Sequence, residues 1–236
     1  MRNKGLLLVV TLVTIFLGGC EAQNIREHVN PLVDQSTTEV TKNREFSVEY
    51  DGGYQEIVVN DNIPDFTSDD LSLSEGVWQT FSDLDHLNRV GVANAIIGKE
   101  SFPTEKREGL SFKPTGWHQK RLDDGQWLYN RSHLIGFQLT GENDNPKNLM
   151  TGTRSLNTPH MLNYENQVKS YIENTGHHVR YRVTPVFKDN ELLARGVQLE
   201  AISIEDSSFQ FNVYIYNIQE GYELDYVTGS SKIIED

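Results

Sequence analysis

The feature that most constrains the fold is a series of three strand-like segments near the C-terminus. They cover residues 178–187, 192–204 and 209–218, and turn-forming residues at 188–190 and 205–207 separate them. Short turns can join antiparallel strands, whereas parallel strands need a long crossover connection. The sequence therefore predicts an antiparallel meander in the C-terminal part of the chain.

The remaining segments add further strands and at least one helix. Residues 54–60 alternate in the manner of a strand, 90–99 form an apolar run bounded by glycines, and 127–129 form another short strand-like segment. The best helical region is 148–175, where Pro159 predicts an interruption because proline lacks the amide hydrogen that a helix interior needs. We therefore expect an α+β fold, with a central antiparallel sheet and flanking helices and loops.

The N-terminus has the pattern of a targeting segment. Arg2 and Lys4 precede an apolar run over residues 6–17, which is too short to cross a bilayer comfortably. The run ends in Leu-Gly-Gly-Cys, a string that resembles the bacterial lipobox and closes at Cys20, the only cysteine of the chain. Residues 1–20 are therefore predicted to be a lipoprotein signal peptide. An ordinary secretory signal cleaved nearby is the alternative.

The rest of the chain divides into two parts. Residues 21–45 are polar and lack apolar periodicity, which predicts a tether between the lipid and a folded domain. Residues 46–236 are long enough to form one domain with its own core. With Cys20 lipidated no other thiol remains, so we expect neither disulfide bonds nor thiolate chemistry.

The charge is unevenly distributed. The chain carries a net charge of −13, which taken alone argues against binding a polyanion. Residues 21–90, however, hold 15 acidic and only four basic side chains, whereas 113–154 hold six basic and four acidic ones. Because salt screens charges beyond about 10 Å, the local field of the middle segment matters more than the total. Nucleic acid therefore remains a possible partner.

Reactive side chains are concentrated between residues 129 and 165. Phosphodiester hydrolysis needs a base, a Lewis acid on the phosphate and a cation for the developing charge. In an extended segment, Arg131 and His133 would lie on the same side. The same stretch also offers amide oxygens and a carboxylate, from Asn143, Asn145, Asn148, Asn157 and Glu165.

Several of these residues stand in a recognisable string. Tyr-Asn-Arg-Ser-His-Leu-Ile-Gly covers residues 129–136, Asn-Pro-Lys-Asn covers 145–148, and Thr-Gly-Thr-Arg covers 151–154 ahead of Asn157. Together they resemble the DNA/RNA non-specific endonuclease family, and most of all its streptococcal DNA-entry and secreted nucleases. The resemblance covers residues 54–228 and implies a ββα-metal core. The usual family signature is Asp-Arg-Gly-His, so Asn130 and Ser132 depart from it.

The resemblance also implies a role for each site residue. His133 would be the general base that takes a proton from the attacking water. Asn157 would bind a single Mg²⁺ ion, for which Mn²⁺ is the substitute, and Glu165 would hold a metal-bound water. Asn148 would orient its neighbours, and Arg131 would clamp the phosphate with its planar guanidinium.

Each of these residues also has a purely structural interpretation. Asn157 could cap a turn, Glu165 could be a first-turn acid favoured by the helix dipole, and Arg131 could form an ion pair. His160, close to Asn157, is a weaker candidate for substrate contact, and no role follows for His118.

The function predicted from the sequence is an exported, Mg²⁺-dependent endonuclease that cuts DNA, and potentially RNA, without sequence preference. It would lie on the extracellular face of the membrane, anchored at Cys20, or be secreted. One alternative is a surface lipoprotein that binds nucleic acid with little catalysis. Another is a different metallohydrolase, but no pair of histidines stands at zinc-ligand spacing beside a carboxylate.

Overall fold

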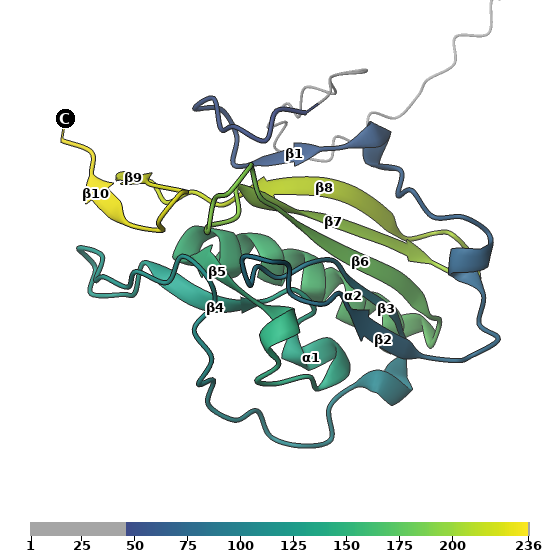
Figure 1. Ribbon diagram of the computed structural model, residues 1–236. Coiled ribbons are helices and arrows are strands. Elements are labelled where there is room, and N and C mark those ends of the chain that lie inside the picture. The colour runs from purple at the N-terminus through teal and green to yellow at the C-terminus, as the bar shows by residue number, and fades with distance from the viewer. Residues whose placement is uncertain (1–45, 236) are drawn as a thin grey trace, which may run out of the picture. The chain divides into compact units, whose positions relative to one another are not determined.

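The computed structural model describes residues 46–235, and a six-stranded antiparallel sheet lies at its centre (Figure 1). The strand order is β1-β8-β7-β6-β3-β2, and every neighbouring pair is antiparallel. The strands are β1 (Glu56–Val58), β2 (Trp78–Phe81), β3 (Ala93–Ile97), β6 (Val179–Val186), β7 (Gly196–Ser203) and β8 (Gln210–Tyr216). Because β6, β7 and β8 follow one another directly, the predicted meander is confirmed.

The two faces of this sheet differ in chemistry. Along β6, Tyr181 and Val183 point into the core, while Arg180 and Arg182 point to the opposite face, as the two-residue period of a strand requires. The helix α2 (Leu162–Thr175) covers the core face (Figure 1). Its contribution to the core includes Val168 and Ile172.

Two short ribbons lie outside the large sheet. β4 (Tyr129–His133) pairs with β5 (Leu149–Thr153), and β9 (Tyr222–Leu224) pairs with β10 (Ser231–Ile233). Between β4 and β5 lies a four-residue helix, α1 (Phe137–Thr140). Single 3₁₀ turns occur at Asn60–Asn62, Asp69–Leu71, Lys99–Ser101 and Pro146–Asn148.

The predicted helical region of residues 148–175 is partly wrong. Its first residues form the strand β5, because Leu149–Thr153 pairs residue by residue with β4 and its threonines suit an extended backbone. A π-helical segment (Leu156–Met161) follows, in which Thr158 has a non-helical backbone before Pro159. The regular helix begins only at Leu162, so the predicted interruption is confirmed.

Local backbone chemistry sets two element ends. α2 ends at Gly176, which has φ 77° and donates its N–H to the carbonyl of Ile172 at 2.9 Å. β1 is shorter than the predicted strand over residues 54–60. Asn60, Asp61 and Asn62 all have positive φ, a conformation that Asn and Asp tolerate better than most residues and that ends an extended strand.

Some expectations fall outside the described part of the chain. Residues 1–20, including Cys20, and the segment 21–45 lie there, so the signal, anchor and tether stay predictions. Between residues 46 and 235, no helix is both long and apolar enough to span a membrane.

Candidate active site

The candidate site is built on the β4–β5 ribbon and the helix that follows it. His133 is the last residue of β4 and pairs with Leu149 of β5, while Arg131 pairs with Thr151. The chain then turns through the π-helical segment that carries Asn157 into α2, which carries Glu165 in its first turn. Figure 1 shows the ribbon beside α2.

His133 is held by a backbone carbonyl. Its Nε2 lies 2.7 Å from the carbonyl oxygen of Asn143, and since a carbonyl can only accept, Nε2 carries the hydrogen. The neutral ring then keeps its lone pair on Nδ1, which is free to take a proton. Burial lowers the pKa of His133 because it disfavours the imidazolium; the Asn143 bond opposes that shift only in part. The carbonyl thus orients this imidazole without a carboxylate.

The loop that carries Asn143 also anchors Arg131. The Asp144 carboxylate accepts hydrogen bonds from the amides of Ser111 and Phe112 at 3.0 and 3.2 Å. The Nε of Arg131 donates to the carbonyl of Phe112, and its guanidinium lies 4.7 Å from the centre of the Trp117 ring. The two terminal nitrogens of Arg131 make no hydrogen bond to any residue in the range 46–235. They are therefore available to a ligand.

Asn148 is fully buried, and both ends of its amide are used. Its Oδ1 accepts from the N–H of Ile135 at 2.9 Å, and its Nδ2 donates to the carbonyl of the same residue at 3.0 Å. Ile135 lies two residues after His133, so Asn148 fixes the backbone where β4 ends. The Asn148 side-chain amide therefore binds only main-chain atoms, and its role is to position the backbone that follows His133.

Asn157 keeps its oxygen available. Its Nδ2 donates to Oγ1 of Thr158 at 3.2 Å, while its Oδ1 accepts no hydrogen bond within the described part of the chain. Asn157 lies in the π-helical segment and not on the regular helix that carries Glu165. Among residues 46–235, no hydrogen bond joins Asn157 to His133 or Glu165.

Glu165 is a buried carboxylate with a single weak side-chain partner. Its Oε2 lies 3.4 Å from the amide nitrogen of Gln138, and burial raises its pKa from 4.5 to about 7. The carboxylate also lies against the backbone of Gly136. A Cβ placed on Gly136 would come within 2.2 Å of Oε2, so any other residue at 136 would displace the carboxylate. Gly136 comes three residues after His133. The contact therefore places the first turn of α2 against the chain just after β4.

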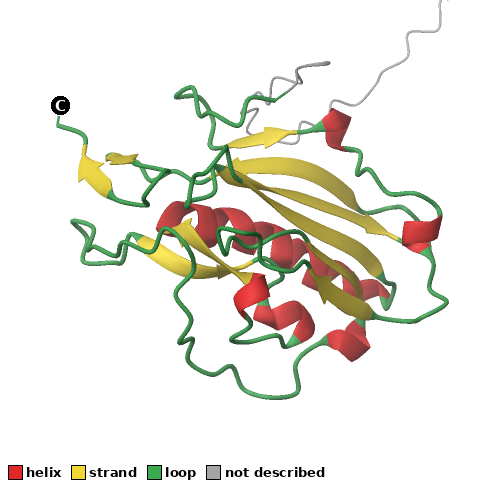
Figure 2. Ribbon diagram, viewed as in Figure 1, coloured by secondary structure: helices red, strands yellow, loops and turns green. Residues whose placement is uncertain are grey.

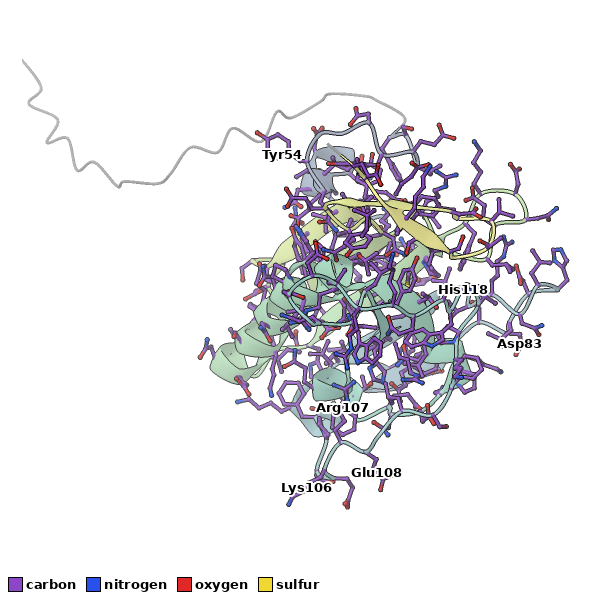
Figure 3. All side chains as sticks on the ribbon, turned by 90° about the vertical axis from the view of Figure 1, so that its left-hand side faces the viewer. Tyr54, Asp83, Lys106, Arg107, Glu108 and His118 are labelled. Atoms are coloured by element: carbon purple, nitrogen blue, oxygen red, sulfur yellow. The ribbon has the colours of Figure 1, made fainter. Side chains whose placement is uncertain are left out.

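Sequence reasoning missed one charged residue near the site. Arg107 belongs to the long loop between Lys99–Ser101 and β4 (Figure 2). In Figure 3 it is turned back toward the domain, while Lys106 and Glu108 point away from it. Its charge lowers the pKa of both His133 and Glu165, so it acts on both groups. Nothing in the irregular sequence of this loop indicated that the chain would return to the site.

The two departures from the family signature lie on the other side of β4. Ser132 is fully buried, its hydroxyl has no hydrogen-bond partner, and Asn130 has an unpartnered Nδ2. The Ser132 side chain lies over Gly152 of β5, its diagonal neighbour, where an added Cβ would come within 2.2 Å of the Ser132 hydroxyl oxygen. The serine hydroxyl therefore occupies space that only a glycine on the opposite strand leaves free.

The remaining histidines have other environments. His160 lies 3.3 Å from the Glu56 carboxylate, to which Tyr164 also donates. His178 contacts both Glu100 and Glu205. His118 is exposed in the loop ahead of β4 (Figure 3).

Cations without an acidic partner are concentrated in one segment of the described chain. The described residues include 16 Lys and Arg side chains, and eight of these form an ion pair with another described residue. The other eight all lie within residues 99–154, where only Lys147 is paired. They are Lys99, Lys106, Arg107, Lys113, Lys120, Arg121, Arg131 and Arg154. The acidic protein thus keeps its unneutralised positive charge in the segment that contains the ribbon.

The donors also suit a hard divalent cation. Asn157 and Glu165 offer oxygen atoms, which Mg²⁺ prefers, and Mg²⁺ commonly keeps several waters and needs few protein ligands. Among residues 46–235, no group of three or more His, Cys, Asp or Glu could hold a metal ion. Oxygen donors of this kind fit Mg²⁺ better than they fit a zinc cage.

An antiparallel ribbon that ends in an oriented histidine, followed by a helix with a buried carboxylate, suits a metal-dependent enzyme that cleaves phosphodiesters. The chain belongs to the DNA/RNA non-specific endonuclease family, whose model matches residues 71–204. It is therefore a nuclease, and nucleic acid is its substrate.

Solved nuclease structures share this fold. The chain is 28% identical to NucA from Streptococcus agalactiae without metal, over 74% of this chain and 85% of NucA, with a TM-score of 0.67. The magnesium-bound form of NucA gives 27% identity over 74% and 86% of the two chains, at the same TM-score of 0.67. The Sda1 nuclease with bound zinc is 27% identical over 67% of this chain and 80% of Sda1, with a TM-score of 0.60.

Proposed function

We propose that the chain is an exported, Mg²⁺-dependent endonuclease that hydrolyses the phosphodiester bonds of DNA with His133 as its general base. The observation that carries this proposal is the hydrogen bond from His133 Nε2 to the Asn143 carbonyl, 2.7 Å long, which leaves Nδ1 as a proton acceptor. The lowered pKa of His133 keeps that acceptor unprotonated at neutral pH.

The base acts on a water molecule. His133 Nδ1 accepts a proton from the water as the water oxygen attacks the phosphorus and the bond from phosphorus to the leaving sugar oxygen breaks. The imidazolium that forms remains held through Nε2 by Asn143, so the ring does not have to reorient during the step. Asn148 supports this geometry by holding both the N–H and the carbonyl oxygen of Ile135.

Asn157 and Glu165 are the groups that would hold the ion. Mg²⁺, when bound, supplies Lewis-acid polarisation of the phosphate and stabilises charge on the leaving oxygen. Asn157 offers a neutral amide oxygen, which leaves the positive charge of the ion undiminished. The Glu165 carboxylate would accept hydrogen bonds from the waters around the ion, and a nearby cation would favour its ionised form over the protonated one.

Two arginines supply the remaining positive charge. Arg131 presents free terminal nitrogens while Phe112 and Trp117 hold the rest of its side chain in place. Arg107 acts on both His133 and Glu165 and would meet the phosphate from the loop side. Both would stabilise a phosphate as it gains charge in the transition state.

The proposal of export rests on the N-terminal sequence. The basic head, the short apolar run and the Leu-Gly-Gly-Cys string favour lipidation at Cys20 and anchoring on the outer face of the membrane. A Cys20→Ser variant should appear in the medium or stay unprocessed. Unchanged anchoring of that variant in a membrane fraction would contradict the lipid site.

The nuclease proposal is tested with protein that lacks residues 1–20. We expect it to degrade plasmid, linear duplex and single-stranded DNA with Mg²⁺, and to stop when a chelator is added. RNA is assayed in parallel to establish substrate preference. Binding of DNA without cleavage, at any Mg²⁺ concentration, would instead favour a surface nucleic-acid-binding lipoprotein.

The metal assignment has its own test. Asn157→Ala should shift the Mg²⁺ concentration for half-maximal rate upward by about tenfold or more, because it removes the protein oxygen proposed to bind the ion. Asn174→Ala, which removes an exposed asparagine side chain near the other end of α2, is the matched control. An unchanged Mg²⁺ titration for Asn157→Ala would contradict the assignment.

A further inference from the structure

The chain before β4 forms a hairpin that extends the ribbon. Leu122 donates its N–H to Gln126 at 2.8 Å, and Leu128 donates to Lys120 at 3.0 Å. Arg121 and Trp127 are bridge partners between these two bonds. The segment 119–122 therefore lies antiparallel to the beginning of the ribbon strand, on the side away from β5.

Arg121 and Trp127 form a stacked pair at the far end of this hairpin. The Arg121 guanidinium lies 3.6 Å from the centre of the Trp127 ring, and its NH1 donates to the Gly125 carbonyl at 2.5 Å. Both side chains are exposed, and Trp127 keeps 46% of its surface open to solvent. A large part of the Trp127 surface therefore stays open to a ligand.

A second stacked pair lies nearer the candidate site. Because side chains alternate along a strand, Arg131 and His133 of β4 project to the same side, whereas Trp127 lies before a bend at Leu128. Arg131 stacks on Trp117 as Arg121 stacks on Trp127. Between the pairs Tyr129 is buried and its hydroxyl donates to the Gly229 carbonyl, so the two pairs are separate contact points and not one continuous groove.

The charge of this region matches a polyanion. Residues 113–133 contain four cations, Lys113, Lys120, Arg121 and Arg131, and only two acidic residues, Asp123 and Asp124. None of the four cations forms an ion pair with a described residue, whereas every described Lys and Arg outside residues 99–154 does. Unpaired cations interleaved with aromatic rings are the chemistry that binds phosphates and bases together.

We propose that Arg121 and Trp127 form a second contact for the nucleic-acid substrate, remote from the scissile phosphate. Arg121 pairs with a backbone phosphate, and Trp127 offers its ring to a sugar or an unpaired base. The inference rests on the proposed nuclease function and concerns only how the substrate beyond the cleaved bond is held.

The position of the pair predicts which part of the substrate it reaches. Trp127 and His133 are six residues apart, which sets an upper limit of about 20 Å on their separation along an extended backbone. Duplex DNA advances about 3.4 Å per base pair, so the contact lies within about six base pairs of the cleaved bond. A small diester that fills only the cleavage site cannot reach the pair. Its effect should therefore depend on substrate length.

The test compares Arg121→Ala and Trp127→Ala with wild type on two substrates. One is a duplex of about 30 base pairs, and the other is bis(p-nitrophenyl) phosphate, which occupies only the cleavage site. On the duplex, Trp127→Ala should raise KM about 5- to 100-fold with little change in kcat. Arg121→Ala should raise KM and reduce the slope of log affinity against log salt by about one. On the small diester, both variants should match wild type.

Matched controls come from elsewhere on the surface. Tyr54→Ala removes an aromatic ring that is 68% exposed, and Lys188→Ala removes an exposed cation that is paired with Glu49. Neither should alter KM on the duplex. If Trp127→Ala does not fold, the exposed Arg121→Gln substitution serves as the test instead.

Two outcomes would overturn the inference. An unchanged duplex KM in both variants would mean that the pair only stabilises the hairpin and does not contact the substrate. An equal loss on both substrates would mean that it acts through the ribbon and not through the substrate. Failure of the wild-type protein to cleave either substrate would count against the proposed function, which separates the two claims.

Discussion

At the scale of single residues, backbone groups do much of the positioning in the candidate site. Asn143 orients His133 through its carbonyl, and Asn148 holds Ile135 through both peptide atoms. The sequence pointed to His133 and Asn148 through the family string. It could not point to Asn143 as a carbonyl partner, because a main-chain contact depends on how the loop closes and not on the side chain at that position.

The pKa of His133 gives a prediction for the pH profile. Burial and the charge of Arg107 both lower the pKa of His133. The unprotonated base therefore persists to lower pH, and the acid limb of the kcat/KM profile should lie below pH 6.5. Arg107→Ala removes a repulsive charge, raises the pKa of the imidazole and should move that limb to higher pH. Lys106→Ala, which removes the neighbouring exposed cation, is the control. A limb that stays in place in Arg107→Ala would contradict the electrostatic assignment.

A second residue-scale prediction concerns the unusual Ser132. Gly152→Ala should lower the free energy of unfolding by about 1–3 kcal/mol, because its Cβ would overlap the Ser132 hydroxyl. Ser132→Gly removes that hydroxyl, so the double variant should recover most of the loss. Urea unfolding of the four proteins measures the coupling. Strictly additive effects would show that the two positions do not compete for the same space.

At the scale of elements, the ribbon and α2 show what sequence patterns can and cannot predict. The meander of β6, β7 and β8 was predictable because alternation and turn residues agree. The strand Leu149–Thr153 was not, because its short sequence takes an extended form only through pairing with β4. Pro159 indicated an interruption, but not that Asn157 would lie on a separate π-helical turn.

The burial of Glu165 in α2 gives a stability prediction for the metal-free protein. Its pKa is raised to about 7, so the native state favours the protonated form and loses stability as pH rises from about 4.5 to about 7. Glu165→Gln should therefore be more stable than wild type by up to about 3 kcal/mol at pH 8, and by less than about 1 kcal/mol at pH 5.

Urea unfolding with a chelator present, at the two pH values, measures this difference. Glu173→Gln, on the same helix with its carboxylate largely exposed, is the control and should show no such pH dependence. Equal stabilities of wild type and Glu165→Gln at both pH values would contradict the burial argument.

At the scale of the whole molecule, an acidic chain keeps its unpaired basic side chains in the segment 99–154, which carries part of the candidate site. The sequence showed a locally basic segment over residues 113–154. The structure adds that the cations elsewhere in residues 46–235 are matched by carboxylates, while those of residues 99–154 are mostly not. This pairing depends on tertiary contacts such as Arg182 with Glu200, which a count of charges cannot reveal. Net charge alone would have argued against the substrate.

The most direct test of the account is the single-turnover cleavage rate of His133→Ala at saturating Mg²⁺. We expect a fall of about 100-fold or more, because general-base catalysis contributes on that order, with the thermal transition and DNA affinity close to wild type. A His133→Ala protein that folds, binds DNA and cleaves it as fast as wild type would contradict the central claim that this imidazole activates the attacking water.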